Sequence, residues 1–571
     1  MSKYVDIDNE NFYKFINKKF SHYKIPKKHK TLKEICFPKK YEFQIPQKFL
    51  AEIINPDTPY KGLLVYHRIG AGKTCTAINI AERFKKKKKI MIVVPASLRG
   101  NFRSELRSPC GGNNYITNAE RAELKQHHPS SPEYKEIIKK SDERIDKVYT
   151  IYSYNKFVDL IKQKSLKLEN TLLIIDEVHN MISETGTYYE ALYDIIHSAP
   201  DSMRLVIMSA TPIFDKPTEI ALTMNLLIRG KKKMPTGRAF IEKFVDTKYT
   251  NKGPVYSVKN MDIFKRYVRG YISYFRGAPP HSFPHTEIHI TRVKMSDRQE
   301  KLYHRVVGKE TKSDTVRDYL NVDIPTSFFI GARMISNINY PNNKIGRKGY
   351  ESLKENDLDI PHMKDISPKF IKILRRIKKC EGTVFLYSNF KEYGGLLPFI
   401  RLLEHHHFKN YQYYGSGKKR FAVWSGDEDP KYREEFKTVF NNKNNKDGSQ
   451  IKLILGSSAI KEGVSLLRIR EVHVLESYWN WSRLHQVIGR ASRFCSHKDV
   501  PKNRQIIDVY IYLAVHPNIK MSIDQHIMNM AINKQLINNQ FEQALKEAAI
   551  DCELFKNANV YPGEDDIICE V

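Results

Sequence analysis

The feature that most constrains the fold is an alternation of short apolar runs with stretches long enough to form a helix. In the first half of the chain, five runs rich in Val, Ile and Leu lie at residues 62–66, 90–95, 148–154, 172–177 and 205–211. Intervening stretches such as 73–86 and 187–197 are long enough to be crossover helices. Strands that alternate with helices in this way predict a parallel sheet covered on both faces.

The alternation lapses after residue 230 and then returns, which predicts a second α/β lobe. The second set of apolar runs lies at residues 383–390, 421–426, 451–458, 472–477 and 508–515. Residues 522–556 then carry apolar side chains at helical spacing. We therefore expect an α/β protein with two parallel sheets and a helical C-terminal tail. The expected parts are a basic extension (1–40), a first lobe (41–285), a linker or insertion (286–365), a second lobe (366–520) and a helical tail with an acidic end (521–571).

The charge balance favours a polyanionic partner. The chain of 571 residues has 95 Lys and Arg against 64 Asp and Glu, which gives a net charge of +31. Nucleic acid is the first candidate and an anionic membrane surface the second. An AT-rich genome would also raise the number of lysines, so the charge alone does not name a function. No run of about 18 apolar residues predicts a membrane span, and the N-terminus lacks the apolar core of a secretory signal.

The cysteines predict a reducing compartment. There are seven, with no C-x-x-C pair among them, which argues against a zinc finger. An odd and dispersed set predicts reduced thiols in a cytosol-like environment. They are Cys36, Cys75, Cys110, Cys380, Cys495, Cys552 and Cys569.

A phosphate-binding loop is predicted directly after the first apolar run. The segment His67-Arg68-Ile69-Gly70-Ala71-Gly72-Lys73-Thr74 precedes a helical pattern. Gly70 and Gly72 would let backbone N–H groups close around phosphate oxygens at the N-terminus of that helix. Lys73 would reach the β- and γ-phosphates of ATP, and the Thr74 hydroxyl would bind Mg²⁺. His67 stands where this loop usually has its first glycine.

Two further motifs follow apolar strands at the same expected edge of the sheet. Asp176 ends the run LLIID, where a carboxylate can hold Mg²⁺, and Glu177 beside it can act as the general base on water. The alternative for such an acidic pair is a solvated turn, but the carboxyl ends of parallel strands are where these sheets place ligands. Ser209-Ala210-Thr211-Pro212 follows the fifth strand and is compatible with either a linking role or a helix cap.

In the second lobe, the segment QVIGRASR (486–493) has helical spacing. Arg490 and Arg493 are three residues apart, so we expect both on one face of a helix. Two guanidiniums there suit a γ-phosphate presented by the other lobe, whereas the alternative is a surface helix with ordinary salt bridges.

These motifs, in this order, resemble those of the superfamily 2 helicases and translocases. Three further segments narrow the resemblance to the viral ATPases of large nucleocytoplasmic DNA viruses. They are YSNF (387–390), DGSQ (447–450) and GYISYFRG (270–277). That group includes the poxvirus nucleoside triphosphate phosphohydrolase I and the early transcription factor small subunit. The resemblance covers roughly residues 41–515.

The resemblance implies two RecA-like lobes and a DNA-dependent ATPase with a DEVH box that uses ATP and Mg²⁺ in viral transcription. It implies an adenine contact for Gln47 and a catalytic role for Gln486 beside Arg490 and Arg493. It also implies that Glu462-Gly463 couples nucleotide to nucleic acid. The expected partners are DNA, with single strands favoured, and the viral transcription machinery. The expected location is the virion and the host cytoplasm, with no secretion and no membrane partner.

Three alternatives stay open at this point. RNA could be the track instead of DNA, duplex unwinding could accompany translocation, and ATP could merely lock the lobes of a promoter-binding or scaffold factor. The intact Lys73, Asp176 and Glu177 count against the scaffold, because it needs no carboxylate to position water.

Other conspicuous residues have a plainer interpretation. We expect Lys85 to Lys89 to be solvated at a helix end, and Trp479 and Trp481 to pack within the lobe rather than stack on a base. Lys231 to Lys233 are a better candidate for a DNA contact. His405 to His407 cannot converge on one metal ion if they are helical, because consecutive side chains diverge by about 100°.

Overall fold

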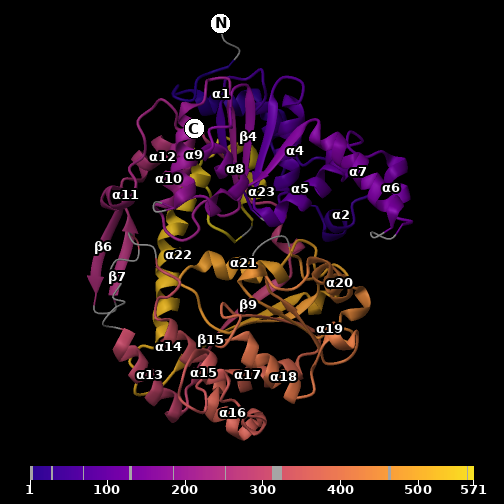
Figure 1. Ribbon diagram of the computed structural model, residues 1–571. Coiled ribbons are helices and arrows are strands. Elements are labelled where there is room, and N and C mark those ends of the chain that lie inside the picture. The colour runs from indigo at the N-terminus through magenta and orange to yellow at the C-terminus, as the bar shows by residue number, and fades with distance from the viewer. Residues whose placement is uncertain are drawn as a thin grey trace. The chain divides into compact units, whose positions relative to one another are not determined.

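The computed structural model describes residues 4–570 except for 28–29, 69, 128–130, 184–185, 251–252, 311–319, 321–323, 461–463 and 562. The chain forms two compact units (Figure 1). Unit 1 contains Met1–Pro279 and Leu536–Val571, and unit 2 contains Pro280–Gln535.

Unit 1 is built on a six-stranded parallel sheet in the order β3-β2-β4-β5-β1-β8. Its strands are β1 (Gly62–His67), β2 (Lys89–Val94), β3 (Tyr149–Ser153), β4 (Thr171–Asp176), β5 (Arg204–Ser209) and β8 (Ile272–Phe275). The five expected runs are thus all strands. Two more strands, β6 (Val245–Thr250) and β7 (Gly253–Val258), form a separate antiparallel pair.

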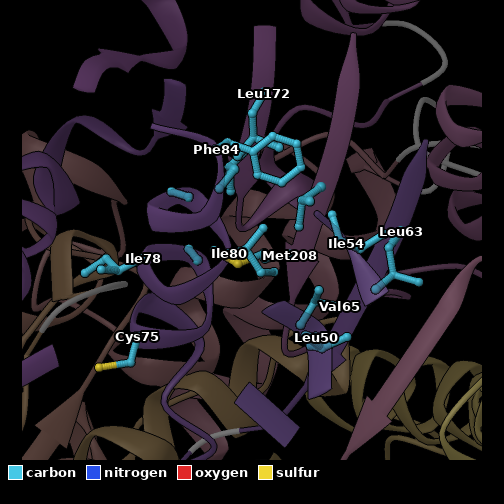
Figure 2. Packing of buried hydrophobic residues seen from close by; sticks show 14 of the residues in the cluster. Leu50, Ile54, Leu63, Val65, Cys75, Ile78, Ile80, Phe84, Leu172 and Met208 are labelled. Carbon is cyan, nitrogen blue, oxygen red and sulfur yellow. The ribbon is translucent and has the colours of Figure 1, made fainter. Parts of the chain in front are cut away.

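The helices of unit 1 cover this sheet. They are α1 (Phe12–Lys19), α2 (Leu32–Cys36), α3 (Ile45–Ile53), α4 (Lys73–Phe84), α5 (Arg99–Leu106), α6 (Asn118–Leu124), α7 (Pro132–Asp146), α8 (Tyr154–Lys162), α9 (Thr187–Ser198), α10 (Glu219–Leu227), α11 (Gly237–Phe244), α12 (Met261–Val268) and α23 (Cys552–Asn559). Alternate residues of the strands, such as Leu63 and Val65, face a cluster that includes Leu50 and Phe84 (Figure 2). Burying large aliphatic and aromatic side chains of this kind contributes about 1.5–3 kcal/mol each.

The ends of the chain take part in this core. Phe12, Tyr13 and Ile16 of α1 are buried in the same cluster as Phe555 of α23. The segment expected to be an extension ahead of the first lobe therefore supplies part of its packing. The hydroxyl of Tyr13 donates to the carbonyl of Ala548 at 2.8 Å.

Unit 2 contains a seven-stranded sheet in the order β11-β12-β13-β10-β14-β15-β9, and its strand pairs are parallel. The strands are β9 (His285–Lys294), β10 (Thr383–Tyr387), β11 (Lys409–Asn410), β12 (Arg420–Trp424), β13 (Leu453–Gly456), β14 (Ile469–Val474) and β15 (Ile506–Val515). The two parallel sheets confirm the expected α/β fold class. Strand β9 lies in the stretch expected to be linker, yet it forms an edge of this sheet.

The helices of unit 2 are α13 (Asp297–Glu310), α14 (Ile330–Asn337), α15 (Gly346–Tyr350), α16 (Ile360–Ile366), α17 (Pro368–Lys379), α18 (Leu396–His405), α19 (Tyr411–Tyr414), α20 (Pro430–Phe440) and α21 (Trp481–Ala491). Helix α22 (Ile523–Glu547) contains the boundary between the units. Together, α22 and α23 form the expected helical C-terminal tail. Among the described residues, no helix is both long and apolar enough to cross a membrane.

The expectation of reduced thiols throughout is wrong in this structure, which contains disulfide bonds. Cys75 pairs with Cys110, and Cys552 pairs with Cys569, with Cα atoms 5.7 and 5.6 Å apart. These partners are 35 and 17 residues apart in the chain. Folding brings them together, so the lack of a C-x-x-C pair did not exclude bonding. Cys380 is buried and free.

Candidate ATP-binding site

The loop from β1 to α4 in unit 1 has the backbone of a phosphate-binding loop. Gly70 and Gly72 adopt positive φ angles of 85° and 69°, a region that glycine enters at no steric cost. A Cβ atom at Gly72 would lie 2.6 Å from the Nε2 atom of Gln47, so a side chain there would displace Gln47 as well as strain the backbone. Helix α4 begins at Lys73, and its first N–H groups are placed to bind an anion.

His67 ends β1 and lies outside the turn itself. The ring is fully buried, and its Nε2 atom lies 3.1 Å from the Ser273 hydroxyl of β8. Burial and the charge of Lys73 lower the pKa of His67 to about 3, so the ring is neutral at physiological pH. The residue that departs from the usual loop pattern is therefore part of the core.

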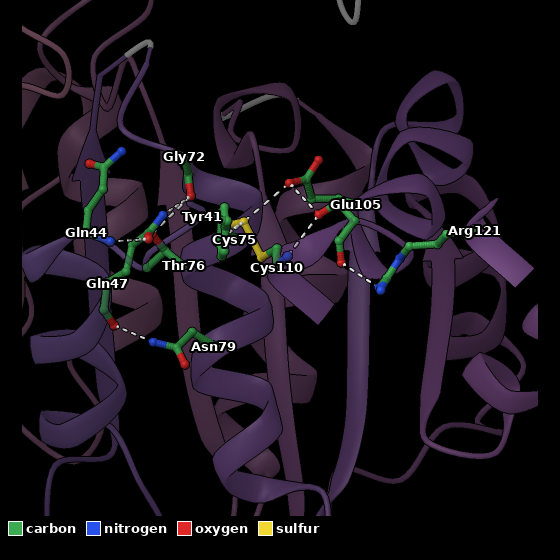
Figure 3. Close-up of a disulfide and its surroundings, with 11 residues drawn as sticks. Tyr41, Gln44, Gln47, Gly72, Cys75, Thr76, Asn79, Glu105, Cys110 and Arg121 are labelled. Atoms are coloured by element: carbon green, nitrogen blue, oxygen red, sulfur yellow. Dashed lines mark hydrogen bonds between the residues drawn. A yellow bond between two sulfur atoms is a disulfide. The ribbon is translucent and has the colours of Figure 1, made fainter. Parts of the chain in front are cut away.

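Gln47 lies against the same loop (Figure 3). Its Nε2 atom donates to the Gly72 carbonyl at 3.1 Å, and its Oε1 atom accepts from the backbone N–H of Gln44 at 2.9 Å. The side chain is almost completely buried. Gln47 thus fixes the position of α3 relative to the loop.

Lys73 and Glu177 form an ion pair at the carboxyl edge of the sheet. The Nζ atom of Lys73 lies 2.6 Å from the Oε1 atom of Glu177. Glu177 follows β4 with φ 49° and ψ 48°, a left-handed conformation that is uncommon for residues other than glycine. Such backbone strain tends to occur at functional positions, because the surrounding structure must hold it in place.

Asp176 is the last residue of β4, and its carboxylate is largely buried. Its Oδ1 atom accepts from the N–H of Glu177 at 3.0 Å. The hydroxyl of Tyr154 donates to the carbonyls of Asp176 and Glu177 at 2.5 and 3.0 Å, which fixes the backbone of the acidic pair. Thr74 is the second residue of α4. A carboxylate and a hydroxyl are the oxygen donors that Mg²⁺ prefers, so the residues present fit that ion.

The arginine motif of unit 2 differs from the expectation in one respect. Helix α21 ends at Ala491, because Ser492 leaves the helical conformation with φ −84° and ψ 83°. Arg493 therefore lies beyond the helix, and the prediction that both arginines share a helix face is wrong. Both guanidiniums nevertheless donate to the Val464 carbonyl, at 3.4 Å from Arg490 and 3.1 Å from Arg493. The carbonyl of Gln486 accepts from the Nε atom of Arg490 at 3.1 Å.

Comparisons with known proteins decide the family. The family model for the res subunit of type III restriction enzymes matches residues 35–214, and that for the helicase conserved C-terminal domain matches residues 368–495. A protein of Acanthamoeba polyphaga mimivirus, named as an ATP-dependent RNA helicase, is 69% identical over 567 residues, which cover 99% of both chains. The chain is an ATP-hydrolysing member of helicase superfamily 2. This relative comes from a virus, which agrees with the resemblance of the motifs to viral ATPases.

A more distant viral relative agrees with this assignment. A protein of African swine fever virus, named as a homologue of the termination factor NPH-I, is 27% identical to this helicase over 86% of this chain and 76% of its own. The helicase domain of Pyrococcus furiosus Hef aligns over 84% of this chain and 96% of its own, at 14% identity and a TM-score of 0.41, which is too low to support an argument.

One residue that the sequence did not single out connects two motifs of the helicase. The Nδ1 atom of His179 lies 3.5 Å from the Oε2 atom of Glu177 and 3.4 Å from the Ser209 hydroxyl. The ring stacks on Phe214 at 4.9 Å, and burial lowers the pKa of His179 to about 4. A neutral imidazole thus links the DEVH segment to the segment after β5. The signal was present in the sequence as the fourth letter of that motif.

The disulfide between Cys75 and Cys110 lies beside the phosphate-binding loop (Figure 3). Cys75 is in the first turn of α4, directly after Thr74. The Tyr41 hydroxyl lies 3.2 Å from its Sγ atom, and the Oε1 atom of Glu105 lies 3.3 Å away. The bond therefore ties the start of α4 to the segment around Cys110.

The two lysine runs of unit 1 are engaged with neighbouring groups of the helicase. Lys85 pairs with Glu82, Lys87 with Asp57 and Lys231 with Asp8. Lys233 lies 4.0 Å above the ring of Tyr193. Lys86, Lys89 and Lys232 are exposed, and the DNA contact expected of Lys231 to Lys233 stays a prediction.

The remaining conspicuous residues of unit 2 have structural partners. Trp479 is buried and stacks on Tyr478 at 4.0 Å, so it packs within the unit as expected. His405 bonds Glu355 and Asp359 at 2.7 and 2.9 Å. Glu462 and Gly463 lie outside the described residues.

Proposed function

We propose that this helicase is a nucleic-acid-dependent translocase that acts on DNA, preferably single-stranded, during viral transcription. The observation that carries the proposal is the ion pair of Lys73 with Glu177, placed beside Asp176 at the carboxyl edge of the first sheet. A chain that only bound ATP would not need a carboxylate held beside its phosphate-binding lysine by a left-handed backbone conformation. The net charge of +31 supports a polyanionic track.

The roles follow from the chemistry of each group. Gly70, Gly72 and Lys73 hold the phosphates of ATP, and Thr74 and Asp176 hold Mg²⁺, which offsets phosphate charge when bound. Lys73 turns from Glu177 to the phosphates, which frees the carboxylate to accept a proton from the attacking water. Gln47 contacts adenine from the position where it holds the loop.

Arg490 and Arg493, with Gln486 beside them, are proposed to complete the catalytic set as the lobes close. Guanidiniums that stabilise the charge on the transferred phosphoryl group are worth about 10³–10⁵ in rate. We therefore expect Arg490→Ala and Arg493→Ala to lower the ATPase rate by about 10³-fold or more, with a much smaller change in nucleotide affinity. Wild-type turnover in both variants would show that these arginines only support the Val464 carbonyl.

RNA is the second candidate track, because the mimivirus relative is named as an RNA helicase. DNA and transcription are favoured by the resemblance to the poxvirus ATPases and by the viral relative named as a termination factor homologue. The same resemblance supports the proposal that the helicase acts with the viral transcription machinery, in the virion and the host cytoplasm. A scaffold in which ATP only locks the lobes is less favoured, since Glu177 has no role there.

The test is the ATPase rate of the full chain with single-stranded DNA, single-stranded RNA or heparin at equal charge. Binding alone would prove little, because a basic chain binds polyanions at low salt. We expect single-stranded DNA to accelerate hydrolysis more than heparin does, with salt lowering the apparent affinity but not the saturated rate. If single-stranded RNA accelerated hydrolysis more than single-stranded DNA, RNA would be the nucleic acid on which the helicase acts. Equal stimulation by heparin, or none by either nucleic acid, would overturn the proposal.

A further inference from the structure

The edge of the second sheet carries histidines and carboxylates that the ATPase reaction does not use. Strand β9 pairs on one side with β15 and ends the sheet. Because side chains of a strand alternate between faces, His285, Glu287 and His289 lie on one face of β9. The register of the two strands places Asp508 of β15 directly opposite Glu287.

The polar atoms of Glu287, His289 and Asp508 lie close together. The Nε2 atom of His289 lies 3.0 Å from the Oδ1 atom of Asp508 and 4.0 Å from the Oε2 atom of Glu287. One ligand atom from each of the three residues lies within 4.8 Å of the other two. The Nε2 atom of His285 lies 3.7 Å from the Oε1 atom of Glu287. His285 and His289 are about 13 Å apart along the strand, at about 3.3 Å per residue, so His285 flanks the three donors and does not join them. Donors around a tetrahedral ion with bonds of about 2.0–2.2 Å are separated by about 3.4 Å, so small side-chain movements would suffice.

The neighbours orient these groups as an outer shell does around a metal. Tyr510 is opposite His289 in the register, and its ring stacks on the imidazole at 4.8 Å with an interplanar angle of 19°. The guanidinium of Arg470 lies 3.5 Å from the Oδ2 atom of Asp508, so the Oδ1 atom is the one directed to His289. Contacts of this kind fix the ring plane and the carboxylate of metal ligands.

We propose that Glu287, His289 and Asp508 form a binding site for one divalent transition-metal ion, with water completing the coordination, and Zn²⁺ is the best-matched candidate. One imidazole and two carboxylates are a donor set for such ions. The set differs from the oxygen donors Thr74 and Asp176, which suit Mg²⁺. The contrast with His405 to His407 is geometric, because alternate residues of a strand converge on one face.

Metal binding would link the edge strand to its neighbour. The three side chains are partly exposed, with His289 and Glu287 more accessible than Asp508, so an ion can enter from solvent. The present contacts between imidazole and carboxylate would be replaced by bonds to the ion. The expected consequence is a more stable unit 2 when the metal is bound.

The test is a Co²⁺ titration of the full chain without nucleotide and with excess Mg²⁺, which occupies the oxygen-donor site. Wild type is compared with His289→Gln and Glu287→Gln, which keep side-chain size. The matched control is His304→Ala, because His304 also pairs with a glutamate, Glu300, at 3.1 Å, but on a helix and with no third His, Cys, Asp or Glu donor among the described residues. Thiolate ligands give Co²⁺ an intense charge-transfer absorption, so a site at Cys75, Glu105 and Cys110 would be recognised if the disulfide between the two cysteines were reduced.

We expect wild type and His304→Ala to bind one Co²⁺ that Zn²⁺ displaces, with the weak visible bands of nitrogen and oxygen ligands. Each of the two ligand variants should weaken this binding by about 10-fold or more, since even outer-shell changes cost about 10–100-fold. Zn²⁺ should raise the melting temperature of wild type but not that of His289→Gln. If one variant does not fold, the other still decides the result. Equal affinity in wild type and both variants, or a thiolate spectrum alone, would overturn the proposal.

Discussion

The ATP-binding edge of unit 1 and the interior of unit 2 each hold a lysine and a carboxylate whose N and O atoms lie 2.6 Å apart. The side chains of Lys73 and Glu177 are 13% and 18% exposed, whereas those of Lys369 and Asp524 are 1% and 2% exposed. The distance is the same, but the surroundings differ. The comparison separates an ion pair that can exchange partners from one that the fold requires.

The two ion pairs differ in how many other hydrogen bonds their members make. Lys369 also donates to the Asn337 side chain at 3.0 Å and to the Leu475 carbonyl at 3.1 Å, and Asp524 accepts from the N–H of Ala514 at 2.8 Å. Within the described part of the chain, the Lys73 ammonium bonds Glu177 alone. A fully bonded buried pair is costly to break, while Lys73 can move to a phosphate.

The largest effect is expected at the exchangeable pair, on the rate. Glu177→Gln should keep nucleotide binding and lower turnover by about 10²–10⁴-fold, the range for a positioned general base. Lys73→Ala should lose nucleotide binding or turnover, because it removes the group that meets the phosphates. Steady-state ATPase rates and nucleotide titrations measure both effects.

Unfolding by urea is the control for these two variants. We expect both to lose less stability than any variant of Lys369, since their side chains reach solvent. Normal hydrolysis by Glu177→Gln would remove its assignment as the base. A large loss of stability in either variant would show that this pair, too, is structural.

The buried pair should show its effect in stability instead. Lys369→Met should lower the free energy of unfolding by about 3–5 kcal/mol, because it leaves the Asp524 carboxylate buried without its cation. Asp524→Asn keeps an acceptor for Ala514 and removes only the charge, so the double variant should lose less than the sum of the two singles. Additive losses in urea unfolding would mean that the two groups do not interact.

The sequence singled out both residues of the first pair and neither residue of the second, for physical reasons. Lys73, Asp176 and Glu177 stand in local patterns, a glycine loop and a strand end, whose geometry follows from neighbouring residues. Lys369 lies in the stretch PKFIKILRRIKK, where it resembles the exposed lysines around it. Its burial depends on contacts with Asp524, which is 155 residues away.

Strand β9 was missed for a related reason. Its residues HTEIHITRVK alternate, but as an edge strand it leaves both faces partly open to solvent, so neither face is uniformly apolar. The central strands of both sheets were predicted because burial on two faces makes them continuous apolar runs. The residue roles at the ATP site remain predictions, and the parallel fold class is confirmed.

Asp551 is a buried carboxyl group whose described hydrogen bonds come from a hydroxyl and an N–H group instead of a lysine, so it can be compared with the two ion pairs. Asp551 is fully buried, and it accepts from the Ser273 hydroxyl and from the N–H of Tyr274 at 3.0 Å. Burial raises the pKa of Asp551 from 3.8 to about 7, so the folded state holds a proton that the unfolded state has released. Its contribution to stability is therefore fully present below about pH 4 and is lost as the pH rises through about 7.

Asp551→Asn tests this sign. Between pH 4 and 7, wild type should lose stability relative to the variant with a slope of up to about 1.4 kcal/mol per pH unit. Urea unfolding of both proteins over this range gives the difference directly, and other titrating groups cancel in it. Parallel curves would show that Asp551 is ionised in the folded state.

The smallest effect is expected for a third pair at the same distance. The Nζ atom of Lys87 lies 2.6 Å from the Oδ1 atom of Asp57, but these side chains are 54% and 76% exposed. Water screens both charges, and ordering two mobile side chains costs entropy, so Lys87→Met or Asp57→Asn should change the free energy of unfolding by about 0–1 kcal/mol. Any loss should shrink further at high salt. A loss as large as that of Lys369→Met would mean that distance, rather than burial and bonding, sets the strength of these pairs.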